Sequence, residues 1–234
     1  MTDIQIRHLT KTFGSVKAVT DLSFGAEAGK VTVLLGPNGS GKTTTLRVLL
    51  GTVRATAGDA LIGGQRYEDL SCPRRRVGAL LDSTGFHPGR RARDHLRVLA
   101  AAADVPDSRV DEVIGQMGLA DAASRRVRTF SLGMRQRLGL AAAILGEPEV
   151  LVLDEPANGL DPVGIAWLRD QLRSLATAGR TVVVASHGLA EVAQLADDVV
   201  IISAGQLRFS GPLAEIGDTG SALESAFLKL IATA

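Results

Sequence analysis

The sequence predicts an α/β protein built on a largely parallel sheet, and two patterns of apolar residues carry this prediction. Short runs rich in β-branched residues, each bounded by Gly, Asp, Thr or Ser, are typical of strands buried on both faces of a sheet. They lie at residues 31–35, 150–153, 182–185 and 199–202. Segments with helical periodicity separate several of these runs, which favours alternating strands and helices. A chain of 234 residues can bury the core that such a fold needs.

The N-terminal segment has a different pattern. Apolar residues alternate with polar ones at Ile4 and Ile6, and again at Leu22 and Phe24. A period of two is typical of strands with one buried face. We therefore expect a small antiparallel β layer before the first parallel strand.

The middle of the chain predicts an inserted helical lobe. From about residue 90 to residue 146 the apolar residues follow helical spacing, with breaks at Pro106, Gly118 and Pro148. Further helices are expected at 163–178 and 188–196. The expected division is a β layer and core from residues 1–89 and 147–216, a helical lobe from about 90–146, and a C-terminal helix at 217–234.

Composition excludes several functional classes. The formal net charge is +1 and aromatic residues are few, so nucleic acid is not an expected partner. The single cysteine, Cys72, rules out an intrachain disulfide and a cysteine-rich zinc site. No apolar run approaches the roughly 18 to 20 residues of a membrane-spanning helix. Asp3, Gln5 and Arg7 interrupt the region where a secretory signal would be apolar, so we expect a protein of the reducing cytoplasm.

A glycine-rich loop follows the first predicted parallel strand. Its sequence is Gly36-Pro37-Asn38-Gly39-Ser40-Gly41-Lys42-Thr43, which fits G-x-x-x-x-G-K-[ST], and a helical run starts at Thr44. In such a loop, backbone N–H groups surround phosphate oxygens at a helix N-terminus. Lys42 adds a positive charge near the β and γ phosphates, and the Thr43 hydroxyl is suited to bind Mg²⁺. We therefore predict that residues 36–44 bind a nucleoside triphosphate.

Two carboxylates follow the run at 150–153. Asp154 and Glu155 come at the carboxyl end of a buried strand, where open α/β sheets bind their ligands. We expect Asp154 to hold Mg²⁺ together with Thr43, and Glu155 to accept a proton from the attacking water. Ser131 precedes another helical run and is an expected N-cap. An anion site at this helix end and a simple cap are the two interpretations.

The order of these motifs resembles that of the nucleotide-binding subunits of ATP-binding cassette (ABC) transporters, over essentially the whole chain. Residues 36–43 match the Walker A loop, 131–136 the ABC signature, 150–155 Walker B, 158–161 the D-loop, and His187 the switch histidine. The resemblance implies a RecA-like P-loop NTPase core with an N-terminal antiparallel β subdomain and an inserted α-helical subdomain.

The sequence departs from the family pattern at two motifs. In place of the usual Leu-Ser-Gly-Gly-Gln signature, Leu132 replaces the first Gly and Met134 the Gln, whereas Ser131 and Gly133 remain. Asp82 stands where the family commonly has its Q-loop glutamine. A carboxylate there can reach Mg²⁺ or a water, but it cannot donate a hydrogen bond as an amide does.

The resemblance also implies roles for single residues. His187 would hydrogen-bond the γ-phosphate and hold the attacking water together with Glu155. Phe13 would stack on adenine, with Val19 or Ala18 as a second wall. The alternative for Phe13 is a place in the core of the β layer.

The implied assembly has two nucleotide-binding subunits that meet head to tail, with ATP and Mg²⁺ as cofactors. ATP on the Walker loop of one subunit would be closed by Ser131, Gly133 and Asp161 of the other. This chain carries one complete set of these motifs, so two identical chains would be enough to form both ATP sites. The family further implies a separate membrane permease, which would hold this chain at the inner face of the cell membrane.

Residues 131–136 and 155–162 most resemble bacterial ABC-2-type exporters, including antibiotic-efflux systems, so export is the expected direction of transport. The alternative is a soluble or regulatory ABC ATPase that is not coupled to transport. Arginines cluster at residues 74–76, 90–93 and 125–128. They form either a solvated face or a surface that docks acidic permease segments or anionic lipid headgroups.

Overall fold

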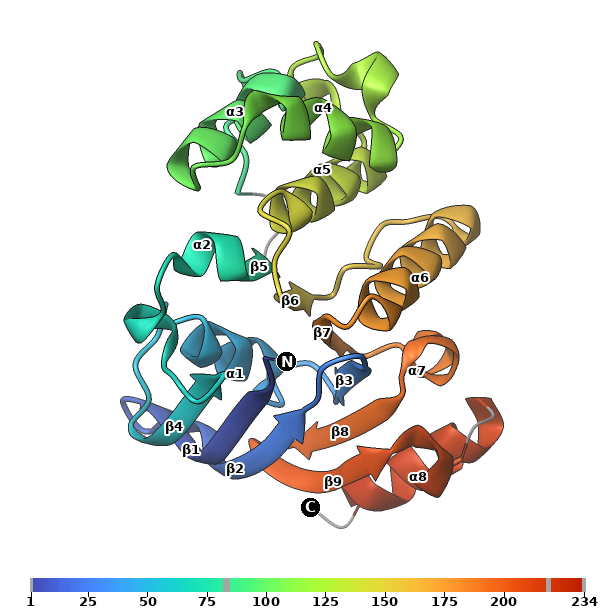
Figure 1. Ribbon diagram of the computed structural model, residues 1–234. Coiled ribbons are helices and arrows are strands. Elements are labelled where there is room, and N and C mark those ends of the chain that lie inside the picture. Colours follow the sequence, from blue (N-terminus) through green and yellow to red (C-terminus); the bar gives the residue numbers. More distant parts are fainter. Residues whose placement is uncertain (1, 82–84, 218–219, 233–234) are drawn as a thin grey trace.

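A six-stranded sheet forms the centre of the molecule (Figure 1), in a computed structural model that describes residues 2–81, 85–217 and 220–232. Its strand order is β5-β6-β7-β3-β8-β9, and every neighbouring pair is parallel except β8 with β9. The strands are β3 (Val31–Leu35), β5 (Val77–Leu80), β6 (Val150–Asp154), β7 (Thr181–Ser186), β8 (Asp198–Ser203) and β9 (Gln206–Pro212). This arrangement confirms the predicted α/β class with a largely parallel sheet.

A second, antiparallel sheet of three strands comes from the N-terminal part of the chain. It contains β1 (Ile4–Phe13), β2 (Val16–Ala26) and β4 (Ala57–Ile62) in the order β2-β1-β4. Ile4, Ile6 and Leu22 are buried, as their alternation predicts. The sequence does not predict β4, because its segment has two Ala and one Gly and little β propensity. Pairing with β1, for example Ile4 with Ile62, holds it in the sheet.

Three helices form a lobe that stands apart from the two sheets in Figure 1. They are α3 (Ala92–Ala102), α4 (Asp107–Gln116) and α5 (Leu132–Ile144). Leu96, Val113 and Leu138 are fully buried between them. Helix α5 also packs on β5, so it connects the lobe to the central sheet.

The remaining helices cover the sheet. They are α1 (Lys42–Leu49), the single turn α2 (Pro73–Arg76), α6 (Pro162–Thr177), α7 (Leu189–Leu195) and α8 (Gly220–Ala232), with 3₁₀ turns at Tyr67–Asp69, Ala120–Ala122, Val127–Thr129 and Leu213–Glu215. Successive residues of β3 point to opposite faces, so Val33 belongs to the apolar cluster with α6 and Leu34 to the cluster with α1. Within the described ranges, no helix has the length and apolarity required to cross a bilayer.

We expect Gly78→Ala to lower the free energy of unfolding by about 2 to 3 kcal/mol, because β5 and α5 leave no room for a side chain there. A β-carbon at Gly78 would overlap the carbonyl oxygen of Ala143 and lie 2.9 Å from Pro148 Cγ. Gly115→Ala is the control, since a β-carbon at this position of α4 meets nothing within 4 Å. It should be neutral or stabilise by up to about 1 kcal/mol. Denaturant unfolding followed by circular dichroism measures both, and equal effects would contradict the close approach.

Candidate nucleotide site

The glycine-rich loop lies between β3 and α1 and opens onto a cavity of about 340 Å³. Inside the loop, Ser40 N donates to Pro37 O (3.2 Å), and both the backbone N–H and the hydroxyl of Thr45 donate to Gly41 O. These bonds fold the loop back on the first turn of the helix. The cavity is lined by Ala18, Asn38, Gly39, Ser40, Gly41, Lys42, Thr43, Thr44, Leu81, Gln136, Asp154, Glu155 and Asn158.

Lys42 is the cation of this cavity. Its side chain is only 6% exposed, and Nζ donates to Gly36 O (2.6 Å) and Pro37 O (3.2 Å). Burial lowers the pKa of Lys42, and the nearby carboxylates of Glu155 and Asp154 oppose that shift. Glu155 Oε1 lies 3.9 Å from Nζ. The loop carbonyls therefore hold a partly desolvated ammonium where it can meet a phosphate group.

Thr43 and Asp154 lie 111 positions apart in the chain and meet at the edge of the cavity. Thr43 Oγ1 donates to Asp154 Oδ2 (2.6 Å), whereas Asp154 Oδ1 is buried and has no hydrogen-bond partner. Burial raises the pKa of Asp154, the Thr43 bond lowers it, and the Glu155 charge raises it again. A buried, half-satisfied carboxylate of this kind is stabilised by a cation.

The Thr43 and Asp154 pair fits Mg²⁺ in the chemistry of its donors. Mg²⁺ prefers oxygen ligands and often takes only one or two from the protein, with waters and substrate phosphates as the rest. Among the described residues there is no group of three or more His, Cys, Asp or Glu that could hold a metal ion. Waters and the phosphates of a bound nucleotide would supply further ligands to a Mg²⁺ held by these two oxygens.

Glu155 is held from three sides. Its backbone N–H donates to Ala185 O on β7, and Gln136 Nε2 on α5 donates to its carbonyl oxygen (3.1 Å). Its Oε1 lies 2.9 Å from Nδ1 of His187. The structure thus brings Glu155, His187 and Lys42 together at one edge of the sheet, as the sequence predicts. No sequence pattern predicts this contact of Gln136 with Glu155, because it depends on how α5 packs.

The expected adenine contacts are only partly found. Phe13 is 49% exposed, with Lys11 Nζ 4.6 Å from its ring centroid, so the alternative of a core residue is wrong. Its ring does not line the 340 Å³ cavity. Ala18 lines this cavity, whereas Val19 is 0% exposed. This corrects the expectation for Val19, which packs under the loop and has no surface to offer a nucleotide.

Ser131, Gly133 and Asp161 lie away from Lys42, in a separate cavity of about 560 Å³. Ser131 Oγ accepts from Met134 N and caps α5, which confirms the predicted N-cap. Asp161 Oδ1 accepts from Gly164 N (2.8 Å) and caps α6. One chain therefore presents two separate cavities, one with the Walker residues and one with the signature and D-loop residues.

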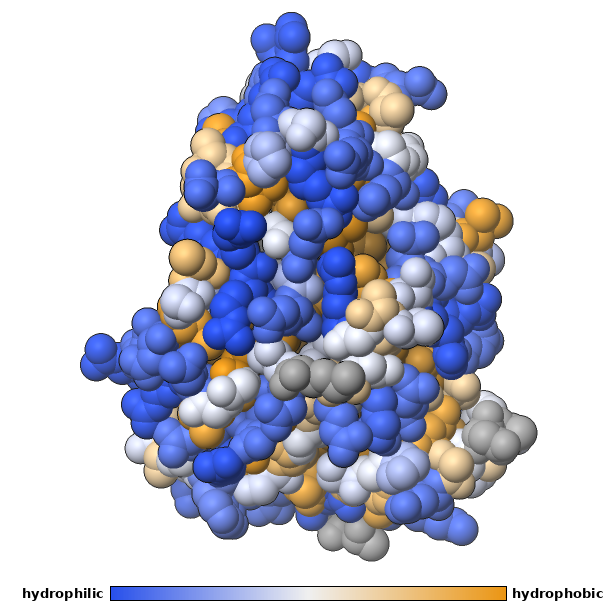
Figure 2. All heavy atoms as spheres, in the orientation of Figure 1, coloured by the Kyte–Doolittle hydropathy of each residue, from blue (hydrophilic) through white to orange (hydrophobic). Residues whose placement is uncertain are grey.

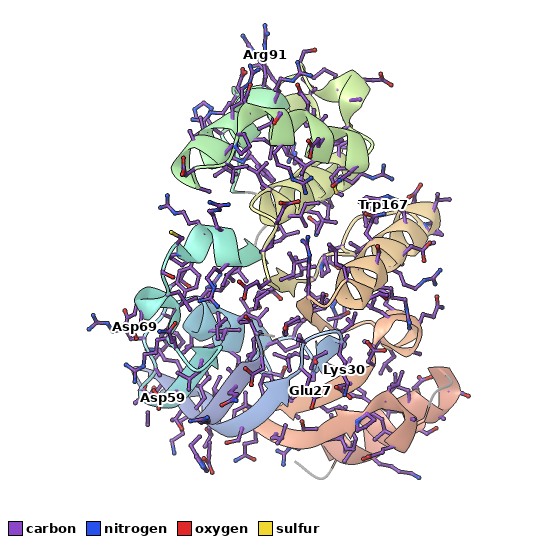
Figure 3. All side chains as sticks on the ribbon, in the orientation of Figure 1. Glu27, Lys30, Asp59, Asp69, Arg91 and Trp167 are labelled. Atoms are coloured by element: carbon purple, nitrogen blue, oxygen red, sulfur yellow. The ribbon has the colours of Figure 1, made fainter. Side chains whose placement is uncertain are left out.

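Two further expectations concern the loop after β5 and the arginine clusters. Asp82, the residue at the Q-loop position, lies outside the described residues. Arg91 and Arg126 form an antiparallel bridge, so two arginine clusters that are distant in sequence lie side by side. Figure 3 shows Arg91 at the end of the helical lobe that is farthest from the sheets.

Comparison with known proteins agrees with this geometry. A family model described as ABC transporter matches residues 19–158. The bacitracin transport ATP-binding protein BcrA of Bacillus licheniformis is 41% identical over 209 residues, which are 88% of this chain and 68% of that protein. The lantibiotic transport ATP-binding protein SrtF of Streptococcus pyogenes is 34% identical over 204 residues, covering 87% and 88%. A solved ATP-binding subunit of an ABC transporter has a TM-score of 0.88 at 25% identity, covering 97% of this chain and 98% of that one. The chain therefore belongs to the ABC transporter family, as an ATP-binding subunit.

Proposed function

We propose that this chain hydrolyses ATP with Mg²⁺ in a head-to-tail dimer and thereby powers export through a separate membrane permease. The observation that carries the proposal is the convergence of Lys42, the Thr43 and Asp154 pair, and the Glu155 and His187 pair around one cavity. These are a cation for phosphate, oxygen ligands for a metal and a base for water, which are the components of phosphoryl transfer to water.

Each residue has a separate task in hydrolysis. Lys42 binds the β and γ phosphates in exchange for its bonds to the loop carbonyls. Thr43 and Asp154 hold Mg²⁺, which when bound neutralises negative charge on the phosphates. Glu155 orients the attacking water and accepts its proton. His187 Nδ1 donates to the Glu155 carboxylate when that nitrogen carries a proton, and Nε2 can donate to the γ-phosphate only in a ring that carries protons on both nitrogens.

The proposed dimer follows from the two cavities. Ser131, Gly133 and Asp161 are too far from the Walker residues of their own chain to share its cavity, so we assign them to the ATP bound by a partner chain. The N-terminus of α5, a helix of 13 residues, would direct its partial positive charge at that phosphate group. Two identical chains suffice, because each supplies both halves. Phe13 would stack on adenine at the exposed end of β1.

Transport is proposed from the relatives. BcrA and SrtF are named as bacitracin and lantibiotic transport ATP-binding proteins. We infer that this chain likewise serves an exporter of a small antibiotic-like molecule and lies at the inner face of the cell membrane, attached to its permease. The test is the ATP hydrolysis rate and the oligomeric state of the purified chain, with and without Mg²⁺. Hydrolysis and a dimer that both require ATP support the proposal; a chain that binds ATP but never hydrolyses it, with or without permease, contradicts it.

We expect Asp154→Asn to lower Mg²⁺-dependent ATP hydrolysis by about 100-fold, the usual effect of removing one charged contact from such a site. Asn still accepts the Thr43 hydrogen bond and removes a buried charge, so folding should be retained. A Mg²⁺ titration of hydrolysis is the measurement. Asp69→Asn is the control, because Asp69 is exposed in a 3₁₀ turn and does not line the nucleotide cavity; Figure 3 labels it at the left edge of the molecule. Unchanged Mg²⁺ dependence in Asp154→Asn would exclude this residue as a ligand.

A further inference from the structure

Within one chain, the signature motif contacts the D-loop at two places, and at each of them a leucine packs on a glycine. Gly159 has φ +78°, and a β-carbon there would overlap the side chain of Leu132, whose own Cβ would be 3.2 Å away. In the reverse direction, a β-carbon at Gly133 would lie 3.4 Å from Leu160 Cδ2. Each segment therefore offers a glycine on which the leucine of the other segment packs.

The same two segments are joined further along their helices. The guanidinium of Arg137 on α5 lies 4.9 Å from the ring centroid of Trp167 on α6, a cation–π distance. Gln136 on α5 also donates to the carbonyl of Glu155, the residue that leads into the D-loop. Figure 3 shows Trp167 on α6, next to the helical lobe. Together with the leucine and glycine contacts, these form a seam between α5 and residues 155–167.

Leu132 is an unusual residue to find at this seam. It is 48% exposed, although apolar side chains of its size are normally buried, and it replaces a glycine of the usual signature. A glycine at position 132 would leave the face of Gly159 uncovered. At this end of the seam the two segments would then be joined only by the contact of Leu160 with Gly133, and the backbone at position 132 would be less restricted.

We propose that Leu132 is a positioning residue that clamps the signature motif to the D-loop, so that Ser131 and Asp161 approach the partner's nucleotide as one unit. The inference rests on the proposed dimer, because the clamp matters only when these residues act across a subunit interface. Loss of the clamp lowers dimer affinity and the cooperativity of hydrolysis and leaves ATP binding by the separate chain unchanged.

The test is a double-mutant cycle with Leu132→Ala, Gly159→Ala and the combined variant. Alanine at Gly159 strains the backbone in either background, but its overlap with Leu132 Cγ and Cδ2 is lost in Leu132→Ala, which leaves only the tighter-than-usual contact of 3.2 Å with the Cβ at position 132. We therefore expect Gly159→Ala to weaken ATP-dependent dimerisation at least about fivefold more in the wild-type background than with Leu132→Ala, the coupling typical of residues in contact. Leu132→Met, which keeps an apolar side chain of similar reach, should retain the wild-type Hill coefficient for ATP.

Val98→Ala provides the control cycle, since Val98 is equally exposed at 49% but lies on α3 away from the seam. The effects of Val98→Ala and Gly159→Ala on ATP-dependent dimerisation should add. If the effects of Leu132→Ala and Gly159→Ala on dimer affinity add to within about twofold, in a chain that does dimerise, the clamp is overturned and the proposed function is left intact. Coupling seen in thermal unfolding but absent from dimerisation would also overturn it. A wild-type chain that forms no dimer with ATP would instead overturn the proposed function itself.

Discussion

Glu155→Gln should reduce ATP hydrolysis by about 100-fold or more, the range for loss of a general base. ATP binding should persist, because glutamine has the same shape and its oxygen can still accept from His187 Nδ1, which lies 2.9 Å from Glu155 Oε1. The substitution also removes a negative charge that faces the site of the γ-phosphate, so the nucleotide is repelled less. The variant should therefore accumulate as a dimer when ATP is added.

Light scattering after size-exclusion chromatography measures the dimer, and phosphate release measures hydrolysis. Glu191→Gln is a useful comparison, because this second carboxylate lies close enough to feel the charges of Glu155 and His187, and burial raises its pKa. Glu191 does not line the nucleotide cavity, so this variant should keep most of the hydrolysis. Near-normal turnover by Glu155→Gln would exclude Glu155 as the base.

Lys42→Met should weaken ATP binding by about 100-fold, since a charge-assisted contact with phosphate is among the strongest single contacts in such sites. Methionine fills most of the volume of the lysine stem, and the cavity keeps its shape. The fold should survive, because the Lys42 side chain is only 6% exposed and its ammonium is partly desolvated, so that replacing it relieves that cost. Unlike Glu155→Gln, this variant should fail to form a dimer with ATP.

Calorimetric titration with ATP in Mg²⁺ gives the dissociation constant. Lys30→Met is the matched control: Lys30 makes ion pairs with Glu27 (2.9 Å) and Asp198 (3.1 Å) and is labelled beside Glu27 in Figure 3. It directly precedes β3, whereas Lys42 follows this strand, and it does not line the nucleotide cavity. Its loss should leave ATP affinity unchanged. If Lys42→Met bound ATP as tightly as the wild type, phosphate would have to be held by the backbone N–H groups alone.

Hydrophilic residues cover most of the face of the molecule shown in Figure 2. Apolar residues appear on that face in several separate patches. Leu132 and Val163 are among the exposed large apolar side chains, and Leu132 lines the signature and D-loop cavity. Neither residue lines the nucleotide cavity.

Local patterns determined much of this protein. The β-branched run at 31–35, the glycine-rich loop and the helix after it occur where the sequence predicts them, because hydrophobic period and turn chemistry act over a few residues. The cap at Ser131 is likewise local, since its partner Met134 is three residues away. The antiparallel layer was predictable from alternation, although β4 was not.

Only the tertiary structure decided which distant residues meet. Strand β6 pairs with β7, which brings Glu155 to His187, while the contact of α1 with β6 brings Thr43 to Asp154. Val19 is buried and so does not reach the nucleotide surface, and the approach of the N-terminal end of α5 to the D-loop sets Leu132 against Gly159. A sequence records the preferences of each segment, but strand order and helix packing follow from burying all apolar faces at once, which no local pattern encodes.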